Sequence, residues 1–174
     1  SYFSFNQDGG RCPECQGEGV VKIEMQFMSD VTMVCEECHG KRFTPEVLEV
    51  RYRGRNVDEI LSISVAEAMY FFSTAPEPDA AQIVERLQPL VYVGLDYLKL
   101  AQSSSTLSGG ESQRIKLAYF LQMSRERGRR DRILFIFDEP TTGLHFHDVE
   151  KLLKAFDALL AGGHSLVVVE HNQD

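Results

Sequence analysis

The sequence has 174 residues, of which 43% are hydrophobic and 25% are charged, and its formal net charge is −8. This balance is typical of a folded globular protein and excludes a disordered or collagen-like chain. The most apolar runs are far shorter than the roughly 20 residues of a membrane-spanning helix, and no charged-then-apolar leader opens the sequence, so we expect a cytoplasmic protein without a membrane partner.

The acidic net charge disfavours a protein that coats nucleic acid uniformly, because phosphate binding requires a local excess of cations. Three basic clusters could make local contacts: Arg51, Arg53 and Arg55; Lys41 and Arg42; and Arg125, Arg127, Arg129, Arg130 and Arg132. Each is more often a solvated surface than a binding site. The sequence starts at Ser1 without Met and stops after an apolar run, so we expect an internal piece of a longer protein.

Two cysteine pairs dominate the first part of the chain. They are Cys12-Pro13-Glu14-Cys15 and Cys35-Glu36-Glu37-Cys38, separated by residues 16–34. Each two-residue gap lets a tight turn direct both thiolates at one ion, and a hairpin between the pairs would complete a tetrahedron. Two disulfides are the alternative, which a reducing cytosol disfavours. Four thiolates leave no open coordination position, so we predict a structural Zn²⁺ site.

Two strands are expected around the cysteines. Apolar and polar residues alternate over Val20–Phe27, which predicts a half-buried strand, and the alternation of Leu48, Val50 and Tyr52 predicts a second one. We therefore expect a zinc-binding module over residues 1–52, with the metal site within residues 12–43. The Cys-x-x-Cys-x-Gly-x-Gly pattern of Cys12–Gly19 resembles DnaJ-type zinc modules, so polypeptide binding is an alternative function.

The middle of the chain, residues 53–105, is predicted to be helical. Ser64 and Glu67 form a capping-box pattern that opens a helix ending at about Phe72. Residues 79–87 predict a second helix, which Pro89 should interrupt, and a polar loop over residues 102–106 follows.

The last part of the chain alternates helices and strands. We expect a helix from about Gly109 to Ser124 and a buried strand over Ile133–Phe137. A second helix has its apolar residues on one face and ends at Gly162-Gly163, and a second buried strand covers Leu166–Val169. The apolar residues of that helix are Val149, Leu152, Leu153, Phe156, Leu159 and Leu160. Strand, helix and strand in this order predict two parallel strands and an α/β fold.

A possible phosphate-binding loop precedes the Gly109–Ser124 helix. In Leu107-Ser108-Gly109-Gly110-Glu111, Ser108 and Glu111 could simply form a capping box. Alternatively, the two glycines let a phosphate approach the amides at the helix amino terminus, and the Ser108 hydroxyl adds a donor.

Polar residues follow both predicted strands. Asp138 and Glu139 follow the first strand and His171 follows the second, so parallel strands would bring them to one sheet edge, where α/β proteins bind ligands. Asp138 would hold a magnesium ion through water, and Glu139 would orient and deprotonate the water that attacks a γ-phosphate. Without this context, two acidic residues at a strand end are often only a turn.

In combination, these motifs resemble those of ABC-type ATPases. Thr106–Arg114 resembles the signature motif, Ile133–Glu139 the Walker B motif, Thr141–His145 the D-loop and His171 the switch histidine. The cysteine pairs, the Phe3-Ser4-Phe5-Asn6 opening and the string Asp138–His145 resemble more narrowly the UvrA family of the bacterial UvrABC excinuclease. This resemblance covers essentially the whole chain.

The resemblance implies a partial ABC-type nucleotide-binding domain with parallel strands, flanking helices, a helical signature region and an inserted zinc module, with its ATPase segment at residues 106–174. It implies Zn²⁺, and ATP with Mg²⁺, as cofactors of the full-length protein. Glu139 and His171 would be catalytic, and the nucleotide-site residues would be Ser108, Gly109, Gly110, Glu111, Gln113 and Asp138. The implied partners are damaged double-stranded DNA, UvrB and a second UvrA copy, in nucleotide excision repair. Another ABC-class ATPase, such as a UvrA-like resistance protein, is an alternative.

The sequence departs from the family pattern in three places. No Gly-x-x-x-x-Gly-Lys-[Ser/Thr] loop occurs, so the lysine and amides that hold the β- and γ-phosphates are missing. Ala101 stands where the family often has glycine, and residues 124–132 are longer and richer in arginine than usual. We therefore expect that this chain alone does not hydrolyse ATP. Ser108, Gly109 and Gly110 would close over ATP bound by the other half of the full-length protein.

Overall fold

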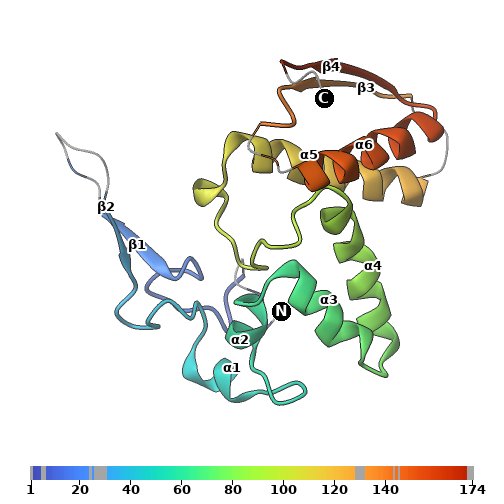
Figure 1. Ribbon diagram of the computed structural model, residues 1–174. Coiled ribbons are helices and arrows are strands. Elements are labelled where there is room, and N and C mark those ends of the chain that lie inside the picture. The colour runs from blue at the N-terminus through green and yellow to red at the C-terminus, as the bar shows by residue number, and fades with distance from the viewer. Residues whose placement is uncertain are drawn as a thin grey trace. The chain divides into compact units, whose positions relative to one another are not determined.

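The computed structural model describes residues 2–4, 7–23, 25, 31–127, 132–142, 144 and 146–171, without the side chains of residues 124–127 and 146–147. The chain divides into two compact units, Ser1–Ser62 and Ile63–Asp174 (Figure 1). The predicted division into residues 1–52, 53–105 and 106–174 concerns function and stays a prediction.

The first unit contains an antiparallel hairpin between the cysteine pairs. Strand β1 (Val20–Ile23) pairs with β2 (Val31–Val34), with Val21 opposite Met33. The hairpin predicted from the cysteine spacing is therefore present. The predicted strand Val20–Phe27 is found over its first four residues, and Glu24, Gln26 and Phe27 lie outside the described residues. The predicted half-burial is wrong for β1, because only Val21 is partly buried in it.

The second predicted strand of this unit is wrong, because Leu48 lies in helix α1 (Pro45–Glu49). Proline fits the first turn of a helix, where its missing N–H has no partner in any case. Three alternating apolar residues were a weaker signal than this helix start. Tyr52 forms an isolated β-bridge with Arg55 and belongs to no described strand. Helix α2 (Val57–Leu61) follows and opens with a capping box between Asn56 and Glu59.

The second unit begins with two helices that pack together. Helix α3 (Val65–Ser73) opens with the predicted capping box, in which Ser64 Oγ accepts from the Glu67 N–H at 3.2 Å and the Glu67 carboxylate accepts from the Ser64 N–H at 2.8 Å. Helix α4 (Pro78–Tyr92) runs past Pro89, so the predicted interruption there is wrong. Proline removes one helix hydrogen bond, but the Pro89 side chain is buried, and its packing offsets part of that loss.

The rest of this unit has the predicted order of helices and strands. A short 3₁₀ helix, η1 (Ser104–Thr106), precedes α5 (Gly109–Arg127), β3 (Leu134–Asp138), α6 (Phe146–Ala161) and β4 (Ser165–Val169). Strands β3 and β4 are parallel, with Leu134 opposite Ser165 and Asp138 opposite Val169, which confirms the α/β class (Figure 1). At the end of α6, the His164 N–H donates to the Leu159 carbonyl and Gly163 has a φ of 87°, a Schellman-type stop that glycine favours.

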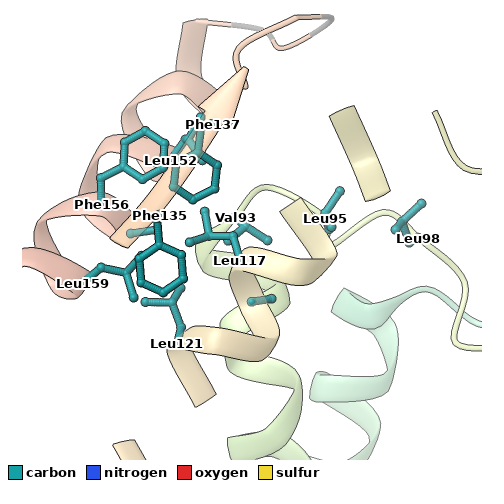
Figure 2. Packing of buried hydrophobic residues seen from close by; sticks show 12 residues of the cluster. Val93, Leu95, Leu98, Leu117, Leu121, Phe135, Phe137, Leu152, Phe156 and Leu159 are labelled. Carbon is teal, nitrogen blue, oxygen red and sulfur yellow. The ribbon is translucent and has the colours of Figure 1, made fainter. Parts of the chain in front are cut away.

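The core of the second unit lies between one face of β3 and helices α4, α5 and α6 (Figure 2). Phe135 and Phe137 point into it, and the rings of Phe137 and Phe156 are 4.8 Å apart. On the opposite face of β3, Leu134 and Ile136 are 59% and 69% exposed. The prediction of a fully buried strand is therefore wrong, because only one face of this two-stranded sheet is covered within the described part of the chain.

Helix α6 also buries a narrower face than predicted. Leu152, Phe156 and Leu159 belong to the core, whereas Leu153 and Leu160 are more than half exposed. Among the helices that the structure describes, none has the length and apolar character needed to cross a bilayer.

Candidate zinc centre and nucleotide site

The four cysteines form one buried cluster at the base of the β1–β2 hairpin. All four are free, and their sulfur atoms all lie within 4.8 Å of one another. Cys12 Sγ is 3.9 Å from Cys35 Sγ, and Cys15 Sγ is 3.6 Å from Cys38 Sγ. Four sulfurs bound tetrahedrally at about 2.3 Å from zinc lie about 3.8 Å from one another. The spacing therefore fits one zinc ion and differs from that of two disulfides.

The backbone of each cysteine pair continues into the same tight turn. Gln16 and His39 both have a φ of 50°, and the glycine after each of them also has a positive φ, 89° at Gly17 and 82° at Gly40. The two turns meet at Gly19, whose N–H donates to Cys15 Sγ at 3.2 Å and whose carbonyl accepts from the Cys35 N–H at 3.0 Å. A Cβ atom on Gly19 would lie 2.8 Å from the Gly40 carbonyl oxygen, so only glycine fits there.

Burial disfavours the ionised form of two of these thiols. It raises the pKa of Cys38 to about 12 and also raises the pKa of Cys12, whereas a hydrogen bond from the Cys38 backbone N–H lowers the pKa of Cys35. A nearby divalent cation strongly favours thiolates. Zinc would therefore ionise thiols that burial otherwise keeps protonated, and the all-sulfur donor set suits zinc rather than magnesium or calcium.

The predicted signature loop forms a capping box at the start of α5. The Glu111 carboxylate accepts from the Ser108 N–H at 2.7 Å, and Ser108 Oγ accepts from the Glu111 N–H at 3.2 Å. The Tyr97 hydroxyl donates to the other Glu111 oxygen, and this hydrogen bond is the largest cause that lowers the pKa of Glu111. Glu111 thus holds the loop in place, and the capping-box interpretation is correct for its local structure.

Behind this loop lies a buried arginine. Arg114 is 4% exposed, and its Nε and Nη1 atoms have no hydrogen-bond partner among the described residues, nor has Gln113 Oε1. A Cβ atom on Gly110 would lie 3.3 Å from the Thr142 carbonyl oxygen and 3.4 Å from Arg114 Nη1. The start of α5 therefore packs closely against the turn that follows Glu139, whereas Gly109 has open space around it.

The acidic pair and His171 lie at the carboxyl ends of β3 and β4. The Glu139 N–H donates to the Val169 carbonyl at 2.8 Å, and Glu139 has a φ of 46°, a conformation that non-glycine residues rarely adopt. His171 Nε2 lies 3.5 Å from Glu139 Oε1. Asp138 ends β3 and is exposed, and the side chain of Glu139 is 49% exposed. The structure thus gathers these three residues at one accessible edge.

The contacts of two neighbouring residues, Glu170 and Thr142, were not predicted from the sequence. Glu170 accepts from the Thr141 N–H at 2.7 Å and so ties the turn after Glu139 to the end of β4. Thr142 Oγ1 lies 3.3 Å from Glu139 Oε2. The position of Glu170 next to His171 was the only feature of the sequence that could have indicated a role for it. Tyr97 had no signal, because it precedes Glu111 by fourteen residues and only the fold joins them.

Some predicted residues lie outside the described part of the chain. These are Phe5 and Asn6 of the opening motif, Gly143 and His145 of the D-loop, and Arg129 and Arg130 of the arginine-rich run. The side chains of Arg125 and Arg127 are also outside it.

Comparison with known proteins relates the whole chain to one family. No protein-family model matches the chain. UvrABC system protein A of Clostridium perfringens is 52% identical over 172 residues, and that of Vibrio cholerae is 51% identical over 174. Each match covers 99% of this chain and 17% of the relative, so the chain spans about a sixth of the length of these proteins.

A solved structure agrees with the sequence matches. UvrA2 from Deinococcus radiodurans superposes with a TM-score of 0.84 at 46% identity, over 98% of this chain and 20% of that one. The matched region thus spans both units of this chain. The chain belongs to the UvrA family, as a segment of the family's longer protein.

Proposed function

We propose that this chain is the part of a UvrA-type DNA-repair ATPase that carries one structural zinc site and one side of each of two nucleotide sites. In the full-length protein, ATP binding and hydrolysis would drive recognition of damaged double-stranded DNA and loading of UvrB. The protein would act as a homodimer in nucleotide excision repair in the cytoplasm. The identity to UvrA relatives over both units supports this function over polypeptide binding by a DnaJ-like module.

The observation that carries the proposal is the meeting of Glu139 and His171 at the sheet edge, 3.5 Å apart. Glu139 is the proposed general base, since its carboxylate is accessible and can accept a proton from an attacking water. His171 is proposed to contact the γ-phosphate from the neighbouring strand. Asp138 would hold Mg²⁺ through water, and the bound ion would neutralise phosphate charge.

The signature loop would serve a second nucleotide. Ser108, Gly109 and Gly110 offer a hydroxyl and backbone amides at the amino terminus of a long helix, where phosphate is favoured. Glu111 would position this loop through Ser108 and Tyr97 rather than touch phosphate, because its carboxylate is already occupied. Gln113 is proposed as a further nucleotide-site residue. The phosphates themselves would be held by loops outside this chain.

The experiment that tests the nucleotide site is a structure of the full-length protein that contains this segment, with a non-hydrolysable ATP analogue and Mg²⁺. We expect the γ-phosphate of one analogue to lie within hydrogen-bonding distance of His171. The same γ-phosphate should contact Glu139 through one water molecule. We expect the γ-phosphate of the other beside Ser108 and Gly110. A γ-phosphate bound away from both places would refute the proposed site.

A further inference from the structure

The segment Arg51–Arg55 of the first unit forms a tight turn with arginine at every second position: Arg51, Arg53 and Arg55. We call this segment the Arg51–Arg55 turn. Tyr52 and Arg55 exchange both backbone hydrogen bonds, with N···O distances of 2.8 and 3.1 Å. Between them, Arg53 and Gly54 have φ values of 51° and 81°. Turns of this kind require positive φ at both central residues and therefore favour Asn or Gly there. Arg53 thus places a long cationic side chain where a small residue would suit the backbone better.

The turn is held by neighbouring groups. Arg51 Nη1 donates to the Gly54 carbonyl at 2.8 Å and pairs with Glu59 Oε2 at 3.1 Å. The same Glu59 oxygen accepts from the Asn56 N–H in the capping box of α2. Arg51, Arg53 and Arg55 are nevertheless exposed. Residues that their surroundings hold in an unfavourable backbone conformation are found mostly at functional sites. The positive φ of Arg53 therefore indicates a functional role for this side chain.

The charge of this region is opposite to that of the chain. Residues 41–55 contain five cations (Lys41, Arg42, Arg51, Arg53 and Arg55) and two anions (Glu46 and Glu49), so their net charge is 5 − 2 = +3 in a chain of net charge −8. Burial raises the pKa of Asp58, and the positive charges of Lys41 and Arg42 oppose this shift, so that carboxylate lies near them. The Arg51–Arg55 turn is therefore the described basic cluster with the most accessible cations.

We propose that the Arg51–Arg55 turn binds the sugar-phosphate backbone of duplex DNA. This inference rests on the proposed function, which supplies DNA as the polyanion. Guanidinium groups match phosphate geometry with paired hydrogen bonds, and a turn held by α2 presents them without a large ordering cost. Backbone contacts position a protein without reading sequence, so the turn would bind DNA of any sequence.

The test uses the zinc-loaded 174-residue chain and a fluorescently labelled undamaged duplex, with affinity measured by anisotropy over a series of KCl concentrations. A plot of log K against log salt has a negative slope, to which each phosphate contact contributes about 0.9. The double variant Arg53→Gln/Arg55→Gln should therefore make the slope shallower by about 2. The control Arg86→Gln/Lys116→Gln changes two exposed cations of the second unit by the same total charge. It should leave the slope unchanged.

A third variant separates lost charge from lost folding. Arg53→Gly suits the positive φ of the turn and removes one cation, so it should weaken DNA binding several-fold while zinc content and thermal stability are kept. Equal losses in the double variant and its control, unchanged binding in Arg53→Gly, or no salt-dependent duplex binding by the parent chain would each overturn the inference. The ATP-analogue structure of the full-length protein tests the nucleotide site separately from DNA binding. Failure of the DNA-binding proposal can therefore be distinguished from failure of the proposed nucleotide site.

Discussion

Glu111 illustrates how much of the candidate nucleotide site is local. The capping box with Ser108 could be predicted from four adjacent residues, because it depends only on helix geometry. The hydrogen bond from Tyr97 could not, since it arises only when the segment after α4 packs beside α5. Arg114 is a similar case, because nothing in the signature pattern indicates that its guanidinium is buried.

Replacing Tyr97 with phenylalanine tests this support. The variant should lower the free energy of unfolding by about 1 kcal/mol at neutral pH, the usual value of one hydrogen bond. Because the folded-state pKa of Glu111 is lowered, this stabilisation is present above the unfolded value near 4.5 and is lost as the pH falls through the folded pKa. Urea unfolding at pH 7 and below pH 4 measures both effects.

Tyr119→Phe is the matched control for this experiment. Tyr119 is 58% exposed, and its ring contacts the ring of Phe120. Loss of the Tyr119 hydroxyl should change the free energy of unfolding little at either pH. A Tyr97→Phe penalty that is as large in acid as at neutral pH would contradict the role assigned to Glu111.

At the level of elements, explicit start and stop signals predicted more reliably than apolar alternation. The capping box at Ser64 and the glycines after Ala161 mark the observed helix ends closely. Alternation failed at Leu48, where Pro45 starts a helix, and proline failed as a stop at Pro89. Tertiary packing decides such cases, since a short apolar pattern suits both a strand and a helix face.

The β3–β4 sheet shows a different limit of the sequence. A run such as Ile133–Phe137 indicates a strand buried on both faces, yet Leu134 and Ile136 are exposed while Phe135 and Phe137 are not. What covers the second face is a property of the whole fold and not of the strand. The parallel pairing itself was predictable, because strand, helix and strand allow few other arrangements.

Removal of zinc tests whether metal binding by the cysteine cluster stabilises the β1–β2 hairpin. Chelation, with metal loss confirmed by elemental analysis, should unfold or loosen residues 12–43, because metal binding and folding are coupled in small zinc sites. Amide hydrogen exchange should therefore accelerate at β1 and β2. Helices α4, α5 and α6 belong to the other compact unit and should keep their protection. An unchanged melting curve after confirmed zinc loss would contradict a structural role.

For the whole molecule, the sequence predicted the four-cysteine cluster, the α/β class and the family, because each depends on residues in fixed spacing or order. It could not predict that the start of α5 would pack against the turn after Glu139, at Gly110 and Thr142. This close contact joins the two proposed nucleotide sites within one chain. A movement of the signature loop would therefore displace the turn beside Glu139 at the proposed catalytic edge.

The most direct measurement is single-turnover ATP hydrolysis by the full-length protein that contains this segment. Glu139→Gln should lower the rate by roughly 10²–10⁴-fold, the usual contribution of a general base, while ATP binding is retained. Glu150→Gln, a matched change on the exposed side of α6, should hydrolyse ATP at the parent rate, and the 174-residue chain alone should show no turnover. Normal hydrolysis by Glu139→Gln, or Glu139-dependent hydrolysis by the chain alone, would contradict the account.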